Sequence, residues 1–183
     1  MRMVKKMKKI NTKELVFAAL FLALGIALPQ LFARNPEIGQ IALPMHFTVM
    51  LCGLICGAKY GGMCGALTPL LSSFFIGKPP LIPIGIPMIF ELCTYGIIIA
   101  LIYSKRNVYI SLIGAMIGGR IVYGIASAIV FGVKGIPYGF EAFIIASVVK
   151  PLPGIIAQII IIPVVMIALT KSGIITRKEA ANG

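Results

Sequence analysis

The sequence predicts an all-α integral membrane protein, a bundle of six transmembrane helices with both termini in the cytoplasm. Hydrophobic residues make up 59% of the 183 residues and the mean hydropathy is +1.02, values typical of integral membrane proteins rather than soluble domains. The apolar residues form runs long enough to cross a bilayer. The net charge of +12 comes from basic residues between these runs, which indicates membrane topology and not nucleic-acid binding.

Six apolar segments approach the length of about 20 residues that a transmembrane helix needs. They cover residues 14–33, 41–57, 60–76, 81–103, 108–132 and 151–170. The second and third segments are short and meet at a tight turn, "CGAKYGG". We therefore expect a basic cytoplasmic N-terminal segment (1–13), a six-helix membrane domain (14–171) and a short cytoplasmic tail (172–183).

The distribution of basic residues predicts the orientation of these segments. With the N-terminus inside, the inner side carries most of the basic residues: Arg2, Lys5, Lys6, Lys8, Lys9, Lys13, Lys59, Lys105, Arg106, Lys171, Arg177 and Lys178. The outer side carries only Arg34, Lys78, Lys134 and Lys150. Because cytoplasmic loops are enriched in Lys and Arg, both termini are expected inside.

The three outer connections differ from the short basic inner ones. They read "RNPEIGQIALP", "IGKPPLIPIGIP" and "VKGIPYGFEAFIIASVVKPLPG", and they are long, lightly charged and rich in proline and glycine. Irregular backbone at membrane depth is tolerated only where protein or a cavity surrounds it. We therefore expect these connections to fold as lids over a cavity.

Small residues recur every four positions in several segments. Ala19, Ala23 and Ala27 form such a stripe in the first segment, where they allow close approach of another helix. That helix belongs either to this chain or to a partner subunit, and the sequence leaves both open. Two glycine sets have the same spacing and are expected to pack internally: Gly53, Gly57, Gly61 and Gly65, and Gly114 with Gly118.

Two charged residues lie deep within predicted spans. Arg120 is about 18 Å above the inner end of its helix, and Glu91 is about 15 Å below the outer end of the preceding one, from the rise per residue. The two side chains are thus at similar depth on adjacent segments. Either they form an ion pair that offsets the cost of burial, or one or both reach a substrate in a cavity.

Other polar residues gather in the outer half. His46 and Lys150 lie near the outer ends of their segments, and Tyr95 and Tyr123 lie one helical turn from Glu91 and Arg120. The complete set of candidate substrate-binding residues is Asn35, His46, Glu91, Tyr95, Arg120, Tyr123, Lys150 and Gln158. Several positive groups and one buried carboxylate suit a small polar ligand that carries a carboxylate.

Motifs of energised or catalytic proteins are missing from the sequence. It contains no GxxxxGK[ST] loop, no HExxH and no GxSxG, and it shows no internal repeat of the kind found in alternating-access transporters. The four cysteines lie within apolar segments and are expected to be packing residues. We expect no catalytic residue, no metal and no cofactor.

Three stretches of the sequence carry a resemblance to a known family. They are "ELVFAALFLALGIALPQ" for the first helix, "LPMHFTVMLCGLICGAKYGGMCGALTPLLSSF" for the second and third, and "PGIIAQIIIIPVV" for the sixth. They resemble the S components of energy-coupling factor (ECF) transporters. The resemblance covers about residues 10–172. It implies a non-enzymatic, multi-pass subunit of a prokaryotic cell membrane, which captures a small vitamin near the outer face for ATP-driven uptake.

The resemblance also implies partners and a substrate. A membrane coupling protein with two ATPase subunits would dock on Ala19, Ala23 and Ala27, and toppling of the whole subunit would deliver the vitamin. The H-x-T-V pattern at His46–Val49 is similar to S components for pantothenate, and the alternative is nicotinate or another vitamin or precursor. Two other hypotheses are an intramembrane enzyme that uses His46 and Glu91, and a membrane scaffold without transport activity.

Overall fold

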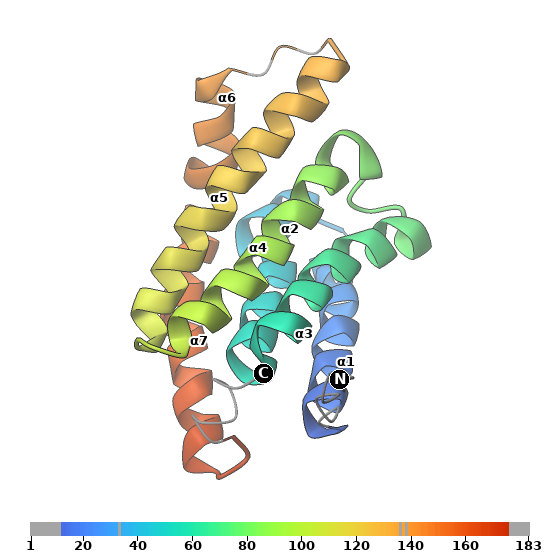
Figure 1. The fold of residues 1–183 in the computed structure, drawn as a ribbon. Helices are drawn as coiled ribbons and strands as arrows, with labels where there is room; N and C mark the ends of the chain where they lie inside the picture. The colour runs from blue at the N-terminus through green and yellow to red at the C-terminus, as the bar shows by residue number, and fades with distance from the viewer. Residues whose placement is uncertain (1–11, 33, 136, 138, 176–183) are drawn as a thin grey trace, which may run out of the picture.

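The computed structural model describes residues 12–32, 34–135, 137 and 139–175, and the secondary structure of this part is entirely helical. Long helices alternate with short helical turns (Figure 1). In chain order the elements are α1 (Thr12–Ala27), η1 (Leu28–Phe32), α2 (Pro36–Ala42), α3 (Pro44–Ile76), η2 (Leu81–Gly85), α4 (Ile86–Tyr103), α5 (Val108–Val133), α6 (Phe140–Ile144), η3 (Ile145–Val149) and α7 (Leu152–Lys171). The N-terminal segment up to residue 11 and the tail from residue 176, including their basic residues, lie outside the described residues.

The long helices agree with the segments expected from hydropathy. α5 begins at Val108 as predicted, where the Asn107 side chain caps it by accepting a hydrogen bond from the backbone N–H of Ile110 (3.1 Å). α7 starts one residue later than expected, at Leu152. Within the described part of the chain, five helical segments are long and apolar enough to cross a membrane, and one of them, Glu37–Ile76, contains the second and third predicted segments.

α3 reverses direction within the predicted turn. Gly57 has φ 83° and ψ 178°, a left-handed conformation that glycine adopts without strain. Gly53 and Gly61 lie on opposite sides of this residue, and the Gly53 Cα is only 2.6 Å from the place a Cβ on Gly61 would occupy. Two residues eight positions apart in a straight helix would be about 12 Å apart. α3 is therefore a hairpin of two helical arms, as Figure 1 shows.

The hairpin packs tightly because of its glycines. A Cβ at Gly61 or at Gly53 would stand 2.6 Å from the backbone oxygen of Gly96 in α4. Gly65 faces the backbone of Leu92 in the same way. These contacts confirm the prediction that the first glycine set serves internal packing, and Gly114 and Gly118 of the second set meet side chains of α4.

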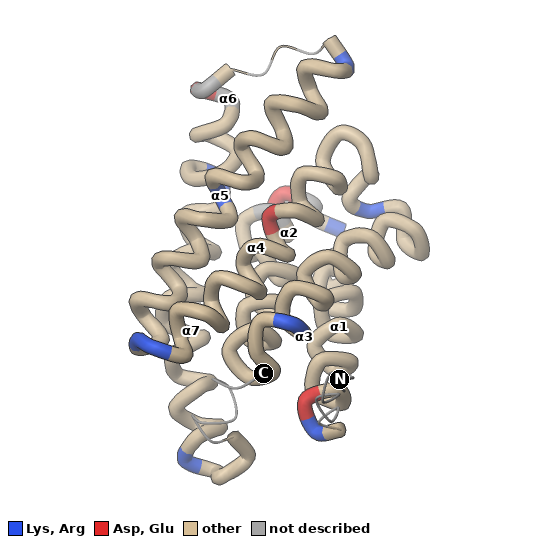
Figure 2. Tube along the Cα trace, in the orientation of Figure 1, with Lys and Arg blue, Asp and Glu red and all other residues tan. Residues whose placement is uncertain are grey.

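α3 occupies the centre of the bundle. α1 packs against it on one side and α4 on the other, and α5 packs against α4. α5 presents an outward stripe of exposed isoleucines every four residues: Ile113, Ile117, Ile121, Ile125 and Ile129. Figure 2 shows that charged positions gather mainly at the helix ends and connections. An apolar exterior with polar groups in the interior is the arrangement that a lipid environment requires.

The three connections predicted to lie on the outer side contain short helices, whereas the sequence predicted irregular lids. α2, η2, α6 and η3 all lie in these connections. Backbone groups at membrane depth need hydrogen-bond partners, and wide π-type helical turns supply them, as in the bonds from Gly85 N–H to the Pro80 carbonyl (2.9 Å) and from Lys150 N–H to the Ile145 carbonyl (3.0 Å), each five residues back along the chain. The connections nevertheless border a cavity, as expected.

Candidate functional site

A cavity of about 500 Å³ lies where the three predicted outer connections meet the N-terminal parts of α3 and α4 and the middle of α5. One wall is apolar and is formed by Phe32, Met45, Met88 and the two prolines of the loop after α3, Pro79 and Pro80. Two serines at the end of α3 hold this loop in place. Ser72 Oγ donates to the Lys78 carbonyl and Ser73 Oγ donates to the Pro79 carbonyl, both at 2.6 Å. The part of the apolar wall formed by Pro79 and Pro80 is therefore held against the end of α3.

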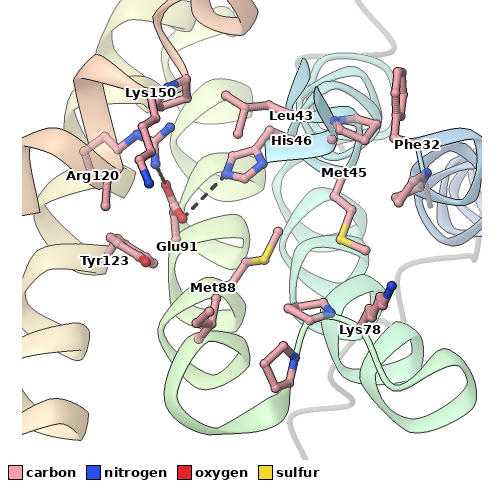
Figure 3. A pocket seen from close by; sticks show the side chains of 18 of the residues that line it. Phe32, Leu43, Met45, His46, Lys78, Met88, Glu91, Arg120, Tyr123 and Lys150 are labelled. Carbon is pink, nitrogen blue, oxygen red and sulfur yellow. Dashed lines mark ion pairs between the residues drawn. The ribbon is translucent and has the colours of Figure 1, made fainter. Parts of the chain in front are cut away.

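The opposite wall carries a buried charged cluster. Arg120 Nη1 of α5 lies 2.8 Å from Glu91 Oε1 of α4, and His46 Nε2 of α3 lies 3.5 Å from Glu91 Oε2. Figure 3 shows the three side chains converging, with Lys150 on the same side of the cavity. Glu91 is 1% exposed and His46 3% exposed. The Glu91–Arg120 pairing considered from the sequence is therefore present, and both side chains also line the cavity.

Several atoms of this cluster lack hydrogen-bond partners among the described residues. They are Glu91 Oε1 and both ring nitrogens of His46. The Arg120 contact is close enough for an ion pair but does not form a directed hydrogen bond to Glu91 Oε1, and 3.5 Å is too long for a hydrogen bond between His46 and Glu91. Buried polar atoms are almost always hydrogen-bonded in native proteins. The cluster is therefore suited to a ligand that supplies both donors and acceptors.

The charge of the cavity is biased toward anions. Among the described residues, three cationic side chains line it (Lys78, Arg120 and Lys150), against the single carboxylate of Glu91. Lys78 and Lys150 are exposed, whereas the Arg120 side chain is only 15% exposed. Tyr123 lines the same cavity one turn beyond Arg120. The arrangement favours a ligand with a carboxylate, and Glu91 additionally offers a position for a positive group.

A second cavity of about 210 Å³ adjoins the first. The two share Leu43, His46 and Arg120 as walls, and the second extends toward η3 and α7. Tyr95 lines it and contacts the His46 ring edge-to-face, with ring centroids 5.4 Å apart. Gln158 lines it as well, and its side-chain N–H donates to the Leu43 carbonyl (3.4 Å). We call this second cavity the side chamber.

The structure gathers most of the candidate residues predicted from the sequence. His46, Glu91, Tyr95, Arg120, Tyr123, Lys150 and Gln158 each line one or both cavities. Asn35 does not line either cavity: it is exposed and precedes α2. Sequence reasoning missed the apolar wall and Ser147 of the side chamber, because a methionine or serine within an apolar run gives no sign of the direction it faces.

The alanine stripe of α1 faces outward. Ala19, Ala23 and Ala27 are exposed, whereas Phe21 and Gly25 of the same helix are buried against the bundle. A Cβ on Gly25 would meet the side chains of Thr48 and Thr68 in α3. Within the described part of the chain the stripe is therefore not used for internal packing. Of the two helices that the sequence left open, one of this chain or one of a partner subunit, the partner helix remains.

Comparison with known families supports the resemblance seen in the sequence. The model of the family "ECF transporter, substrate-specific component" matches residues 13–166, most of the chain and both cavities. The chain belongs to this family. The probable tryptophan transport protein of Bacillus subtilis (strain 168) is 29% identical over 179 residues, covering 89% of this chain and 96% of that protein. No solved structure matches the chain significantly.

Family membership defines the general role of the protein. ECF substrate-specific components are multi-pass membrane subunits of transporters and are not enzymes. They work with an ECF module of a coupling protein and ATPases. The intramembrane-enzyme and scaffold hypotheses are therefore set aside. The particular substrate is a separate question, because the relative carries a different substrate name from the pantothenate favoured by the sequence.

Proposed function

We propose that this S component captures a small amphipathic carboxylate at the outer face of the plasma membrane for ATP-driven import, with tryptophan as the first candidate. The observation that carries the proposal is the buried cluster of Glu91, Arg120 and His46, which lines a cavity with an excess of positive charge and in which Glu91 Oε1 and both His46 ring nitrogens have no hydrogen-bond partner among the described residues. In this proposal Arg120 and Lys150 bind the carboxylate.

Tryptophan is the first candidate because it is a zwitterion with an apolar body. Its ammonium group complements Glu91 Oε1, which has no hydrogen-bond partner among the described residues. Its carboxylate complements Arg120, and its indole complements apolar cavity walls. The name of the Bacillus subtilis relative points to the same molecule.

Pantothenate is the second candidate, and nicotinate the third. Both are carboxylates and fit the excess of cations, and the H-x-T-V pattern at His46–Val49 favours pantothenate. Thr48 of this pattern is buried and donates its hydroxyl hydrogen bond to the Met45 carbonyl (2.9 Å). Only His46 of the pattern lines the cavities. Neither molecule has an ammonium group to satisfy Glu91, which is why tryptophan ranks first.

The composition of the chain permits a direct test. It contains six tyrosines and no tryptophan, so excitation at the red edge of the indole band reports on added tryptophan alone. With the purified full chain in detergent, we expect saturable tryptophan binding, a blue shift of its emission, and a rise in melting temperature. Pantothenate and nicotinate are tested by competition and by thermal shift. Stabilisation by pantothenate and not by tryptophan would shift the assignment to the second candidate, and stabilisation by none of the three would contradict the proposal.

The proposed topology has six membrane crossings and cytoplasmic termini. It rests on the hairpin of α3, whose two arms each count as one crossing, and on the basic residues of the inner connections. Single cysteines introduced at Lys59 and Lys134 on a cysteine-free background test it. A membrane-impermeant thiol reagent applied to intact cells should label position 134 and not position 59, and the reverse pattern would refute the orientation.

The exposed alanine stripe of α1 is the proposed contact with the coupling protein. Ala19, Ala23 and Ala27 leave a shallow face along which a partner helix can approach closely. Both cavities are lined by residues of other elements, so docking at this stripe leaves the binding site free.

A further inference from the structure

The side chamber contains a buried hydroxyl group without a partner. Ser147 lies within the η3 turn, is 0% exposed, and its Oγ has no hydrogen-bond partner among the described residues. It lines the side chamber and not the main cavity. An unpaired buried hydroxyl destabilises a protein by itself, so its presence in a cavity wall suggests pairing with a ligand.

The remaining lining of the side chamber is mostly apolar. Leu43, Met116, Ile117, Val148 and Ile155 contribute aliphatic surface, and Tyr95 closes one side. One side-chain N–H of Gln158 is already engaged with the Leu43 carbonyl. The chamber is therefore an apolar space in which Ser147 Oγ supplies a hydrogen-bonding position.

The size and position of the chamber suit an aromatic ring. An indole at the packing density of protein interiors occupies about 150 Å³, and the chamber has a volume of about 210 Å³. Its boundary with the main cavity is formed by His46 and Arg120, while Glu91 faces the main cavity. A zwitterionic head held by Glu91 and Arg120 thus lies next to the chamber entrance.

We propose that the side chamber binds the ring of the substrate and that Ser147 Oγ accepts the hydrogen bond of the indole N–H, which makes Ser147 the residue that selects for the ring N–H. This rests on the proposed function, since it takes tryptophan as the substrate. The main cavity then serves as the entrance and holds the charged head. Burial of an N–H donor in an apolar space without an acceptor is costly, so one well-placed hydroxyl discriminates strongly between rings.

The test compares tryptophan with its benzothiophene analogue, in which sulfur replaces the ring N–H at nearly the same size. Affinities are measured with the purified full chain, by competition against the fluorescence of bound tryptophan. Wild type is expected to prefer tryptophan by about tenfold or more, because the analogue lacks the donor. Ser147→Ala should weaken tryptophan binding by a similar factor, leave the analogue almost unaffected, and so abolish the preference.

Ser127→Ala is the matched control. Ser127 is also 0% exposed with an unpaired Oγ among the described residues, but it lines neither cavity. The Ser127→Ala variant should retain the wild-type preference for tryptophan over the benzothiophene analogue. Ile155→Phe, which fills the chamber, should weaken tryptophan and its analogue equally and provides a second measurement if Ser147→Ala folds poorly.

The outcomes separate the two proposals. If wild type binds tryptophan and Ser147→Ala keeps the full preference over the analogue, the role of Ser147 is refuted while the proposed function stands. If Ile155→Phe binds tryptophan as tightly as wild type, the ring does not occupy the chamber. If wild type does not bind tryptophan, the proposed function and this inference both fail.

Discussion

The charged cluster offers the sharpest test of how the substrate is held, because Arg120 has two roles that can be separated. It neutralises the buried carboxylate of Glu91 at 2.8 Å, and it lines both cavities. Replacement of Arg120 alone does not separate these two roles, because it also leaves the Glu91 carboxylate, which is 1% exposed, without its ion-pair partner. Breaking a buried pair in this way costs about 3–5 kcal/mol of stability.

We therefore propose a double-mutant cycle that consists of Arg120→Gln, Glu91→Gln and the variant with both substitutions. Arg120→Gln should lower the melting temperature, and the double variant should recover most of it because no unpaired charge remains. A charge-assisted hydrogen bond between arginine and a substrate carboxylate contributes about 1.5–3 kcal/mol. At 1.4 kcal/mol per tenfold change, the double variant should bind tryptophan about 10- to 150-fold more weakly than Glu91→Gln.

The assay is equilibrium binding by tryptophan fluorescence, with thermal unfolding as the check on folding. Tryptophanamide, which lacks the carboxylate, should show little difference between Glu91→Gln and the double variant. Arg106→Gln, in the exposed turn between α4 and α5, is the control for loss of an arginine. Equal tryptophan affinity of Glu91→Gln and the double variant would show that Arg120 only neutralises Glu91.

Three further predictions concern packing, the loop after α3, and the partner surface. Gly65→Ala should lower the free energy of unfolding by about 1–3 kcal/mol in thermal unfolding, because the new Cβ meets the α4 backbone. Gly132→Ala, with open space around it, should be neutral or slightly stabilising. Equal effects of the two substitutions would contradict the packing argument. Ser73→Ala removes a hydrogen bond of about 1 kcal/mol to the loop after α3 and should weaken substrate binding about fivefold, mainly through faster dissociation of the substrate. An unchanged dissociation rate would mean that the loop keeps its position without this hydrogen bond. Ala23→Leu should reduce co-purification with the coupling protein and leave substrate affinity unchanged. Ala128→Leu, at an exposed position of α5, is the control and should co-purify as the wild type does. Full co-purification of Ala23→Leu would show that this face of α1 is not part of the interface.

The helices of this protein could be predicted closely from its sequence. Runs of apolar residues identify segments long enough to span a bilayer, and the rise per residue places Glu91 and Arg120 at similar depth. These inferences depend on position along one helix axis, which sequence spacing determines directly. The reversal near Gly57 was predictable for the same reason, since a glycine-rich interruption between two apolar runs marks a turn.

The candidate site was only partly predictable. Charged and aromatic residues within apolar segments attract attention, because their burial in a membrane is costly without a function or a partner. Asn35 was a candidate as a polar side chain of the connection after the first segment but is exposed, and Ser147 was not a candidate but lines the side chamber. The difference between these residues is the direction in which each faces.

The sequence by itself therefore determined the membrane class, the helical segments and the depth of the polar groups along them. Only the tertiary structure decided that Glu91 lies between Arg120 and His46, that Ala19, Ala23 and Ala27 face outward, and that a second cavity adjoins the first. The physical reason is that depth follows from local helix geometry, whereas the rotation of each helix about its axis and its lateral neighbours follow from packing. In this bundle that packing depends on backbone contacts at Gly53, Gly61 and Gly96, whose partners are far apart in the sequence.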